Sequence, residues 1–204
     1  MAALIQRHAA PSIADADFSS DLHPLLRRVF VTRGALSSAD VDLSMSSLLS
    51  PSQLMGIDGA VNLIVSAMET SSRILIVGDF DADGATSCAL AIRAFEAMGH
   101  SDVRFIVPNR FEYGYGLTPE IVDLAKPQNP SLIITVDNGI SSVEGVAAAR
   151  AAGIDVLVTD HHLPGEQLPD ANVIVNPNQR GCEFPSKALA GVGVIFYVMS
   201  AVRK

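Results

Sequence analysis

The sequence predicts an α/β fold: a mostly parallel open sheet with helices on both faces, preceded by a short helical segment. From Arg73 onward, short apolar runs alternate with stretches of helical spacing. Repeated βα units of this kind form parallel sheets through right-handed crossovers. Three of the apolar runs lead directly into acidic residues. Because open parallel sheets bind ligands at the carboxyl ends of their strands, we expect one functional crevice there.

The residues ahead of the sheet predict a helical preface. Apolar side chains recur at helical spacing over residues 23–30, a second short helical stretch ends near Leu49, and a third covers residues 59–68. The first residues of the chain are polar, small and without pattern, so we expect a flexible arm there. The expected division is an arm over 1–20, a preface over 21–70 and a core domain over 71–204.

The core domain is expected to alternate strands and helices in chain order. Thr118, Pro119 and Glu120 supply an N-cap, a first-turn proline and an acid, which together predict the start of a helix. The expected strands cover residues 74–77, 103–107, 132–136, 156–158 and 173–175. The other expected helices cover residues 85–98, 141–152 and 187–202.

Composition indicates a folded chain. At 204 residues with 49% hydrophobic side chains, the chain can bury a sizeable core. Its longest mostly apolar run, residues 188–202, is shorter than the ~20 residues of a membrane span and predicts a buried helix. The start lacks an apolar signal segment. Cys88 and Cys182 form no Cys-x-x-Cys pair and are expected to be reduced packing residues. We therefore expect a soluble, cytoplasmic protein.

The net charge of −8 argues against a broad nucleic-acid footprint, which is usually basic. An acidic cluster accounts for part of this charge, and bound divalent cations would offset it. Any nucleic acid is therefore expected to be gripped locally or by parts outside this sequence. With 5% aromatic residues and no tryptophan, the chain lacks an extended stacking platform, although Tyr113 and Tyr115 offer rings for stacking on bases.

Carboxylates gather where the predicted strands end. Asp79, Asp81 and Asp83 follow the first strand, Asp137 follows the third, and Asp160 with two histidines follows the fourth. A single aspartate after a strand is often a loop or cap residue. Aspartates at three strand ends instead indicate a divalent cation, because each added carboxylate raises the cost of ionising the others.

The carboxylates and imidazoles at the strand ends indicate which reaction the site supports. Carboxylates with one or two imidazoles suit Mn²⁺ or Mg²⁺ better than a structural zinc ion. Two such ions roughly 3.5–4 Å apart can activate water and stabilise the leaving oxygen of a phosphoryl displacement. The glycine patterns of dinucleotide-binding folds and of P-loops are absent from the sequence. Phosphodiester hydrolysis is therefore the expected chemistry.

Six motifs in order carry a resemblance. They are GDFDADG at 78–84, PNRFEYGYGL at 108–117, VDNGIS at 136–141, TDHHLPG at 159–165, NPNQ at 176–179 and FPSKALAGVGVIFY at 184–197. Together they resemble the catalytic core of the RecJ family, single-strand-specific 5′ to 3′ DNA exonucleases of the DHH phosphoesterase superfamily. The resemblance covers nearly the whole chain from about His23.

The resemblance implies roles for the acids and histidines. The implied metal ligands are Asp81, Asp83, Asp137 and His161, with Asp79 at the same acidic strand end as a further candidate. His162 is implied to meet the scissile phosphate, as a hydrogen-bond donor or as an acid for the leaving group. Asp160 is expected to orient the neighbouring imidazoles, a common means of setting a histidine tautomer.

Substrate contacts are expected from four further residues. Arg110 lies near Gly114 and Gly116, whose flexibility lets backbone approach a phosphate. Its guanidinium can clamp a phosphate with two donors. The alternative is a salt bridge to Glu112 or to the acidic cluster. A substrate contact and a structural role are equally open for the other three, which are Asn176, Asn178 and Lys187.

The expected function is a metal-dependent 5′ to 3′ exonuclease on single-stranded DNA, acting in recombination and repair with two Mn²⁺ or Mg²⁺ ions. Polarity and DNA preference come from the resemblance alone. One alternative is a small-substrate DHH phosphoesterase, such as an oligoribonuclease or a cyclic-dinucleotide phosphodiesterase. Another is a non-catalytic scaffold. The intact metal-ligand candidates of the acidic cluster argue against this alternative. The expected partners are single-stranded DNA and repair or single-strand-binding proteins, without a membrane.

The carboxyl end departs from the family pattern. The resemblance implies a later metal-binding aspartate and a second domain after the helix that contains Gly191 and Gly193. The sequence stops at Lys204, in or just after that helix. We therefore expect a truncated core, weak or inactive by itself.

Overall fold

The computed structural model describes residues 16–204, which divide into two compact units at Leu49 and Ser50. Most of the predicted arm, including His8, lies outside the described residues. The predicted domain boundaries at residues 20 and 70 stay predictions.

The smaller unit is built on one α-helix, α1 (Pro24–Thr32), which begins as predicted. His23 caps this helix, its Nδ1 accepting the Leu25 N–H at 3.2 Å. Phe18 is buried and its ring centroid lies 6.1 Å from that of Phe30. The predicted second helical stretch takes the form of two short 3₁₀ helices, η1 (Ser38–Val41) and η2 (Met45–Ser47). Serine and aspartate side chains there bond nearby backbone, which competes with longer helices.

The larger unit contains a five-stranded parallel sheet of order β2-β1-β3-β4-β5. Its strands are β1 (Ile74–Gly78), β2 (Val103–Ile106), β3 (Leu132–Val136), β4 (Asp155–Thr159) and β5 (Val173–Val175). Every residue of β1 and of β3 is buried. Unbroken apolar strands of this kind are typical of parallel sheets covered on both faces. The predicted fold class is therefore confirmed.

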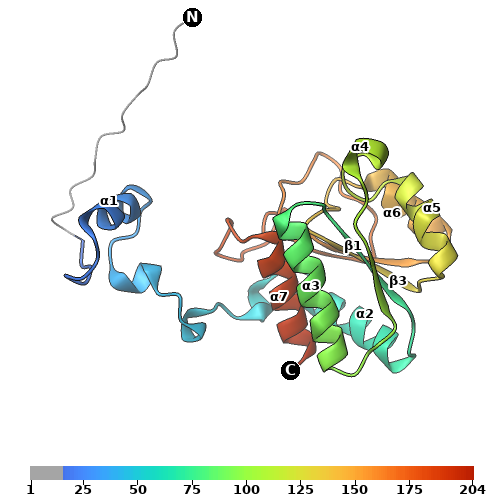
Figure 1. The fold of residues 1–204 in the computed structure, drawn as a ribbon, viewed down its shortest axis with the longest axis horizontal. Coiled ribbons are helices and arrows are strands. Elements are labelled where there is room, and N and C mark those ends of the chain that lie inside the picture. Colours follow the sequence, from blue (N-terminus) through green and yellow to red (C-terminus); the bar gives the residue numbers. More distant parts are fainter. Residues whose placement is uncertain (1–15) are drawn as a thin grey trace, which may run out of the picture. The chain divides into compact units, whose positions relative to one another are not determined.

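Helices cover the two faces of the sheet (Figure 1). On one face α3 (Ala82–Ala97) packs beside α7 (Gly191–Val202), and α2 (Ile57–Glu69) packs against α7 and β5. On the other face α5 (Pro119–Ala125) packs against α6 (Val143–Ala151). As predicted, Thr118 caps α5, its hydroxyl accepting the Ile121 N–H. The remaining short elements are η3 (Pro51–Gln53), α4 (Arg110–Tyr113) and η4 (Lys126–Gln128).

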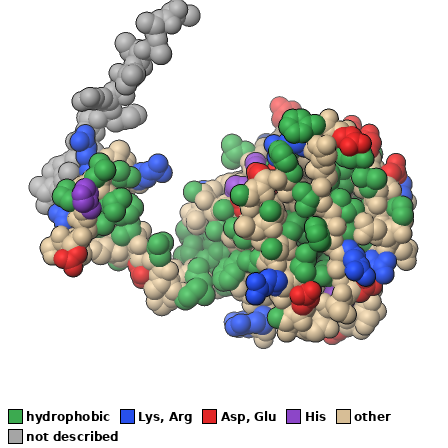
Figure 2. All heavy atoms as spheres, in the orientation of Figure 1, with side chains coloured by type: hydrophobic (Ala, Val, Ile, Leu, Met, Phe, Trp, Pro, Cys, Tyr) green, Lys and Arg blue, Asp and Glu red, His purple; other side chains and the backbone are tan. Residues whose placement is uncertain are grey.

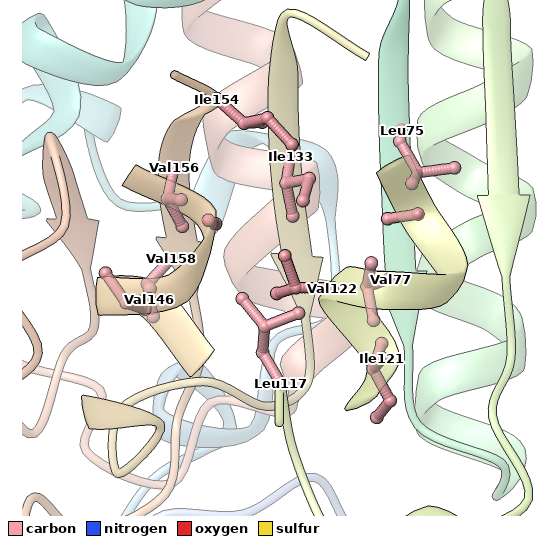
Figure 3. Packing of buried hydrophobic residues seen from close by; sticks show 12 residues of the cluster. Leu75, Val77, Leu117, Ile121, Val122, Ile133, Val146, Ile154, Val156 and Val158 are labelled. Atoms are coloured by element: carbon pink, nitrogen blue, oxygen red, sulfur yellow. The ribbon is translucent and has the colours of Figure 1, made fainter. Parts of the chain in front are cut away.

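One apolar cluster joins the sheet to α5 and α6. Figure 3 shows alternate strand residues Leu75, Val77 and Ile133 facing the helix residues Ile121 and Val122. Successive side chains of a strand point to opposite faces, so the residues between these are directed toward α3 and α7. This packing holds the strand ends in place, and the site is built on those ends.

The start of α3 differs from its prediction. The helix was expected from about residue 85 but begins at Ala82, because Asp81 is its N-cap and accepts the Asp83 and Gly84 N–H groups at 3.0 and 3.1 Å. The acidic run is therefore not one extended segment. Asp79 follows the strand, Asp81 caps the helix and Asp83 lies in its first turn.

The predicted helix over 187–202 begins later, at Gly191, because Ala190 has the extended backbone of an N-cap. Its apolar side chains are largely buried, as predicted. Among residues 16–204, no single helix is long and apolar enough to cross a membrane. One bent pair, Met45–Gln53 with Ile57–Glu69, meets that test by length and composition only.

Candidate active site

The sheet order brings the acidic strand ends together. Because β1, β3 and β4 are neighbours, the residues that follow them share one edge of the sheet. Asp79, Asp137 and Asp160 each come directly after one of these strands and are all buried. Histidine and acidic side chains lie close together on the surface near α4 (Figure 2). The convergence expected from the sequence is present.

Asp137 is the buried acceptor at the middle of this site. Its side chain is 2% exposed, and its backbone adopts a left-handed conformation with φ of 61°. Within the described residues, Asp137 Oδ1 has no hydrogen-bond partner, although His161 Nε2 lies 3.1 Å away. Burial, and then the charges of Asp83 and Asp81, raise the pKa of Asp137 to about 7. An acceptor that is buried, crowded by like charge and without a donor is suited to a cation.

Asp160 organises the loop that carries both histidines. Its Oδ2 accepts the Ile140 N–H at 2.9 Å, and its Oδ1 accepts the His161 N–H at 2.7 Å. The same Oδ1 lies 2.7 Å from His162 Nδ1. Burial opposes ionisation of Asp160, but the bonds from His162 and the backbone outweigh it and lower its pKa. The bond to Asp160 raises the pKa of His162.

Tyr115 adds a hydroxyl to the same imidazole. Its oxygen lies 3.1 Å from His162 Nδ1 and 3.3 Å from Nε2, and it also donates to the Asp137 carbonyl at 3.3 Å. The rings of Tyr115 and His162 meet edge to face. The sequence suggests only base stacking for Tyr115. Its contact with His162, 47 residues away, depends on the fold and leaves no local signal in the sequence.

Asp83 is held by the first turn of a distant helix. Its Oδ2 accepts the Gly191 N–H at 2.8 Å and its Oδ1 accepts the Val192 N–H at 2.7 Å. His161 Nε2 lies 3.7 Å from Asp83 Oδ2. The resemblance implies that Asp83 is a metal ligand, but its contact with the start of α7, 108 and 109 residues away, leaves no signal in the local sequence.

Arg110 pairs with the acidic cluster. Its Nη2 donates to Asp79 Oδ2 at 2.6 Å, and its guanidinium carbon lies 4.0 Å from the centroid of the Phe80 ring. The salt bridge to the acidic cluster, one of the alternatives left open by the sequence, is therefore present. Phe80 and Phe111 meet edge to face and are both exposed. The phosphate-binding role of Arg110 stays a prediction.

The other three predicted substrate residues bond backbone carbonyls of the histidine loop or of the segment 177–182. Asn176 Nδ2 donates to the His162 carbonyl at 3.0 Å, and Asn178 Nδ2 donates to the His161 carbonyl at 2.6 Å. Lys187 Nζ donates to the Pro177 and Cys182 carbonyls at 2.6 and 2.7 Å. These bonds favour the structural alternative for their side chains, and contact with substrate stays a prediction.

An open cavity of about 470 Å³ adjoins His162. Tyr115, Ser141 and Ser142 line it, together with Glu120 and Glu144 at the starts of two helices. The lining mixes these polar groups with apolar side chains such as Leu117 and Ile140. A substrate group that enters this cavity would meet His162 directly.

The donor atoms fit divalent cations. Ligand atoms of Asp79, Asp81 and Asp137 lie within 4.8 Å of one another, and so do those of Asp137, His161 and His162. Asp137 belongs to both groups, which is the arrangement expected of a ligand shared by two ions. Oxygen donors with one or two imidazoles suit Mn²⁺ or Mg²⁺. The unpartnered Oδ1 of Asp137 is an independent sign that a cation belongs here.

Curated relatives of this chain are exonucleases. The chain is 56% identical over 188 residues to "Single-stranded-DNA-specific exonuclease RecJ" of Salmonella typhimurium and 54% identical to the protein of the same name from Escherichia coli. These matches cover 92% of the chain and 33% of each relative. The chain therefore spans about a third of the length of the curated relatives it matches.

Solved structures agree with this similarity. A structure described as exonuclease RecJ bound to manganese matches 76% of the chain and 39% of its own, with a TM-score of 0.69 and 34% identity. RecJ from Thermus thermophilus in complex with Mn²⁺ matches 85% of the chain and 24% of its own, with a TM-score of 0.67 and 29% identity. The model of the DHH family, N-terminal domain, matches residues 73–204, which is the greater part of the sequence. The chain therefore belongs to the DHH family.

Proposed function

We propose that this chain is the catalytic core of a metal-dependent phosphodiesterase that degrades single-stranded DNA from the 5′ end. The observation that carries the proposal is the buried, unpartnered Oδ1 of Asp137, a residue that belongs to both groups of candidate metal ligands. The names of the similar exonucleases supply the substrate class. The similar structures with manganese supply the metal.

Five residues would hold the ions: Asp79, Asp81, Asp83, Asp137 and His161. When bound, divalent ions supply an activated water and charge stabilisation on the oxygens of the phosphoryl group. The protein contributes rigid placement, since the ligands stand at the ends of buried strands and at the start of α3. Rigid placement matters because catalysis depends on the positions of the reacting atoms.

His162 is the group of this chain suited to moving or holding a proton. Its Nδ1 bonds the Asp160 carboxylate, which stabilises the protonated ring and raises its pKa. A protonated imidazole beside the cavity can donate to a phosphoryl oxygen or protonate a leaving oxygen. Asp160 sets the orientation of the ring, as carboxylates bonded to histidines commonly do.

Arg110 is the cation available to a phosphate at the edge of this site. One guanidinium nitrogen of Arg110 donates to Asp79, and the remaining N–H groups can donate to a phosphate oxygen. A local grip of this kind suits a chain of net charge −8, which lacks the basic surface of most nucleic-acid binders. A role in repair and recombination, a cytoplasmic location and contacts with single-strand-binding proteins are part of the same proposal.

The same charge favours one alternative, a small-substrate phosphodiesterase. A short oligonucleotide or cyclic dinucleotide needs few phosphate contacts and would be repelled less by an acidic surface. The scaffold alternative is disfavoured, because a binding module has no need for several buried carboxylates with a raised Asp137 pKa.

The deciding experiment uses the full-length protein with Mn²⁺. Strands labelled at the 5′ or the 3′ end are compared with dinucleotides, and Asp137→Asn serves as the inactive control. Release of labelled mononucleotides from the 5′ end, absent in the control, is the expected result. Cleavage of dinucleotides without cleavage of long strands would replace the proposal with the small-substrate alternative. Absence of cleavage and of Mn²⁺ binding would support the scaffold.

A further inference from the structure

The start of α7 reaches across to the acidic end of α3. The two helices pack side by side, and the Gly191 and Val192 N–H groups point at the Asp83 carboxylate, one to each oxygen. Distances of 2.8 and 2.7 Å are typical of hydrogen bonds to a charged acceptor. The first turn of a helix also carries partial positive charge, which favours an anion there. The start of α7 therefore holds both oxygens of the Asp83 side chain.

The two hydrogen bonds to Asp83 leave some of its acceptor positions free. A carboxylate has about four acceptor positions, and the two N–H groups use one on each oxygen. His161 Nε2, on a ligand candidate from another loop, lies 3.7 Å from Asp83 Oδ2, so the carboxylate faces the site. Two backbone donors that cannot rotate leave the side chain little rotamer freedom. The remaining acceptor positions are thus presented in one direction.

Gly191 also touches the second carboxylate. A Cβ atom at this position would lie 2.5 Å from Asp137 Oδ1, 2.7 Å from its Cβ and 2.8 Å from its Cγ. Contacts this short force a shift, and Asp137 is 2% exposed, with its Cβ close to the backbone. Any side chain at 191 would therefore displace either Asp137 or the helix start. The absence of a side chain lets α7 approach both carboxylates.

Gly193 in the same turn gives the contrast. A Cβ atom there would meet Leu189, 2.4 Å from its Cδ1 and 2.9 Å from its Cγ, which are outer atoms of a side chain that can turn aside. Leu189 is only half-buried and lies in the loop before the helix. The two glycines therefore differ in what surrounds them, although both sit in the first turn of α7.

From this geometry we propose that the first turn of α7 is the positioning element of the metal site. Gly191 and Val192 set the Asp83 carboxylate through their N–H groups, and Gly191 sets Asp137 by close contact. The positioning role rests on one part of the proposed function, that cations bind these carboxylates. It does not require that the protein cleaves DNA. Carboxylate ligands are themselves commonly held by hydrogen bonds, and losing such a support costs metal affinity.

The direct test compares Gly191→Ala with Gly193→Ala in the full-length protein. Calorimetric titration with Mn²⁺ is expected to show affinity about 10- to 100-fold weaker for Gly191→Ala and unchanged for Gly193→Ala. Thermal melting without metal checks that both variants are folded. In an activity assay the Gly191→Ala defect should shrink as Mn²⁺ is raised, because misplaced ligands weaken binding. Wild-type Mn²⁺ affinity in folded Gly191→Ala overturns the proposal.

A second variant keeps the test valid if Gly191→Ala does not fold. Asp83→Asn removes the charge held by α7 and is measured in EDTA. We expect its melting temperature to fall by roughly 3 to 10 °C, since bonds between α3 and α7 weaken. If Asp83 served only as a metal ligand, the substitution should instead raise the melting temperature, because it relieves repulsion between carboxylates in the metal-free site. A melting temperature that rises for Asp83→Asn therefore overturns the proposal.

Failure of this proposal can be told apart from failure of the proposed function. Mn²⁺ affinity and metal-free melting need no DNA substrate. A protein that binds Mn²⁺ with the expected contrast between the two glycine variants supports the positioning role, even if it cleaves no strand.

Discussion

The guanidinium of Arg110 donates a 2.6 Å hydrogen bond to the carboxylate of Asp79, 31 residues away in the sequence. Phe80, the residue after Asp79, supports the guanidinium with its ring face, 4.0 Å from the guanidinium carbon. The acidic cluster therefore carries its own fixed cation. Under the proposed function Asp79 serves the metal and Arg110 serves the phosphate, and measurements of Mn²⁺ binding and of strand binding test the two roles.

Arg110→Ala should weaken strand binding at a saturating concentration of divalent cation, beyond any change in Mn²⁺ affinity that follows from loss of the bond to Asp79. Loss of a hydrogen bond to a charged phosphate is expected to reduce affinity for a single strand by about 10- to 100-fold. Fluorescence anisotropy with Ca²⁺ measures binding, and calorimetry measures Mn²⁺. Arg150→Ala is the matched control, because that arginine forms a surface pair with Asp170. Equal losses of strand affinity in both variants would contradict the assignment.

Asp137→Ala should abolish cleavage and leave the metal-free protein at least as stable as the wild type. The substitution deletes an acceptor that belongs to both groups of ligand atoms, and it relieves repulsion from Asp83 and Asp81. Cleavage of a labelled strand and melting in EDTA are the two measurements. A variant that cleaves near the wild-type rate would show that Asp137 has no part in the reaction.

His162→Ala should retain Mn²⁺ and lose turnover, whereas His161→Ala should weaken both. His162 is held by Asp160 and Tyr115 beside the cavity, and His161 Nε2 lies 3.1 Å from Asp137 Oδ1. Loss of proton transfer costs about 10²- to 10⁴-fold in rate. Calorimetry and single-turnover cleavage separate the two effects. Because a ring nitrogen of His162 also falls within a ligand group, equal Mn²⁺ losses would assign it to the metal instead.

The metal-free protein should lose stability as the pH rises from about 4 to about 7. Asp137 titrates near 7 when folded and near its ordinary value of 3.8 when unfolded, so in this range the folded state binds the extra proton. The penalty is complete above pH 7 and amounts to at most about 4 kcal/mol. Denaturant unfolding in EDTA at pH 5 and pH 8 measures it.

Asp137→Asn is the control for this pH dependence. The variant lacks the titrating group, so its advantage over the wild type should grow between pH 5 and pH 8. His162, whose raised pKa makes a contribution that also fades with rising pH, is present in both proteins and largely cancels. Parallel stability curves for the two proteins would mean that Asp137 ionises normally.

Local patterns in the sequence were sufficient for the sheet and for the ligand candidates. Apolar runs predicted each strand to within a residue or two, most clearly β1 and β3, which are buried throughout and continuously apolar up to their last residues. The placement of Asp79, Asp137 and Asp160 at neighbouring strand ends followed from the rule that parallel strands present their carboxyl ends together. The start of α3 was misplaced because an alternating acidic run resembles extended backbone, while in fact Asp81 caps a helix.

The sequence by itself therefore determined which residues stand at the edge of the sheet and what chemistry they can support. Only the tertiary structure decided how each one is held. The pairing of Arg110 with Asp79, the contact of Tyr115 with His162 and the bonds from Gly191 to Asp83 join segments 31, 47 and 108 residues apart. Contacts of that range depend on how helices pack across the sheet, which leaves no periodicity in the local sequence.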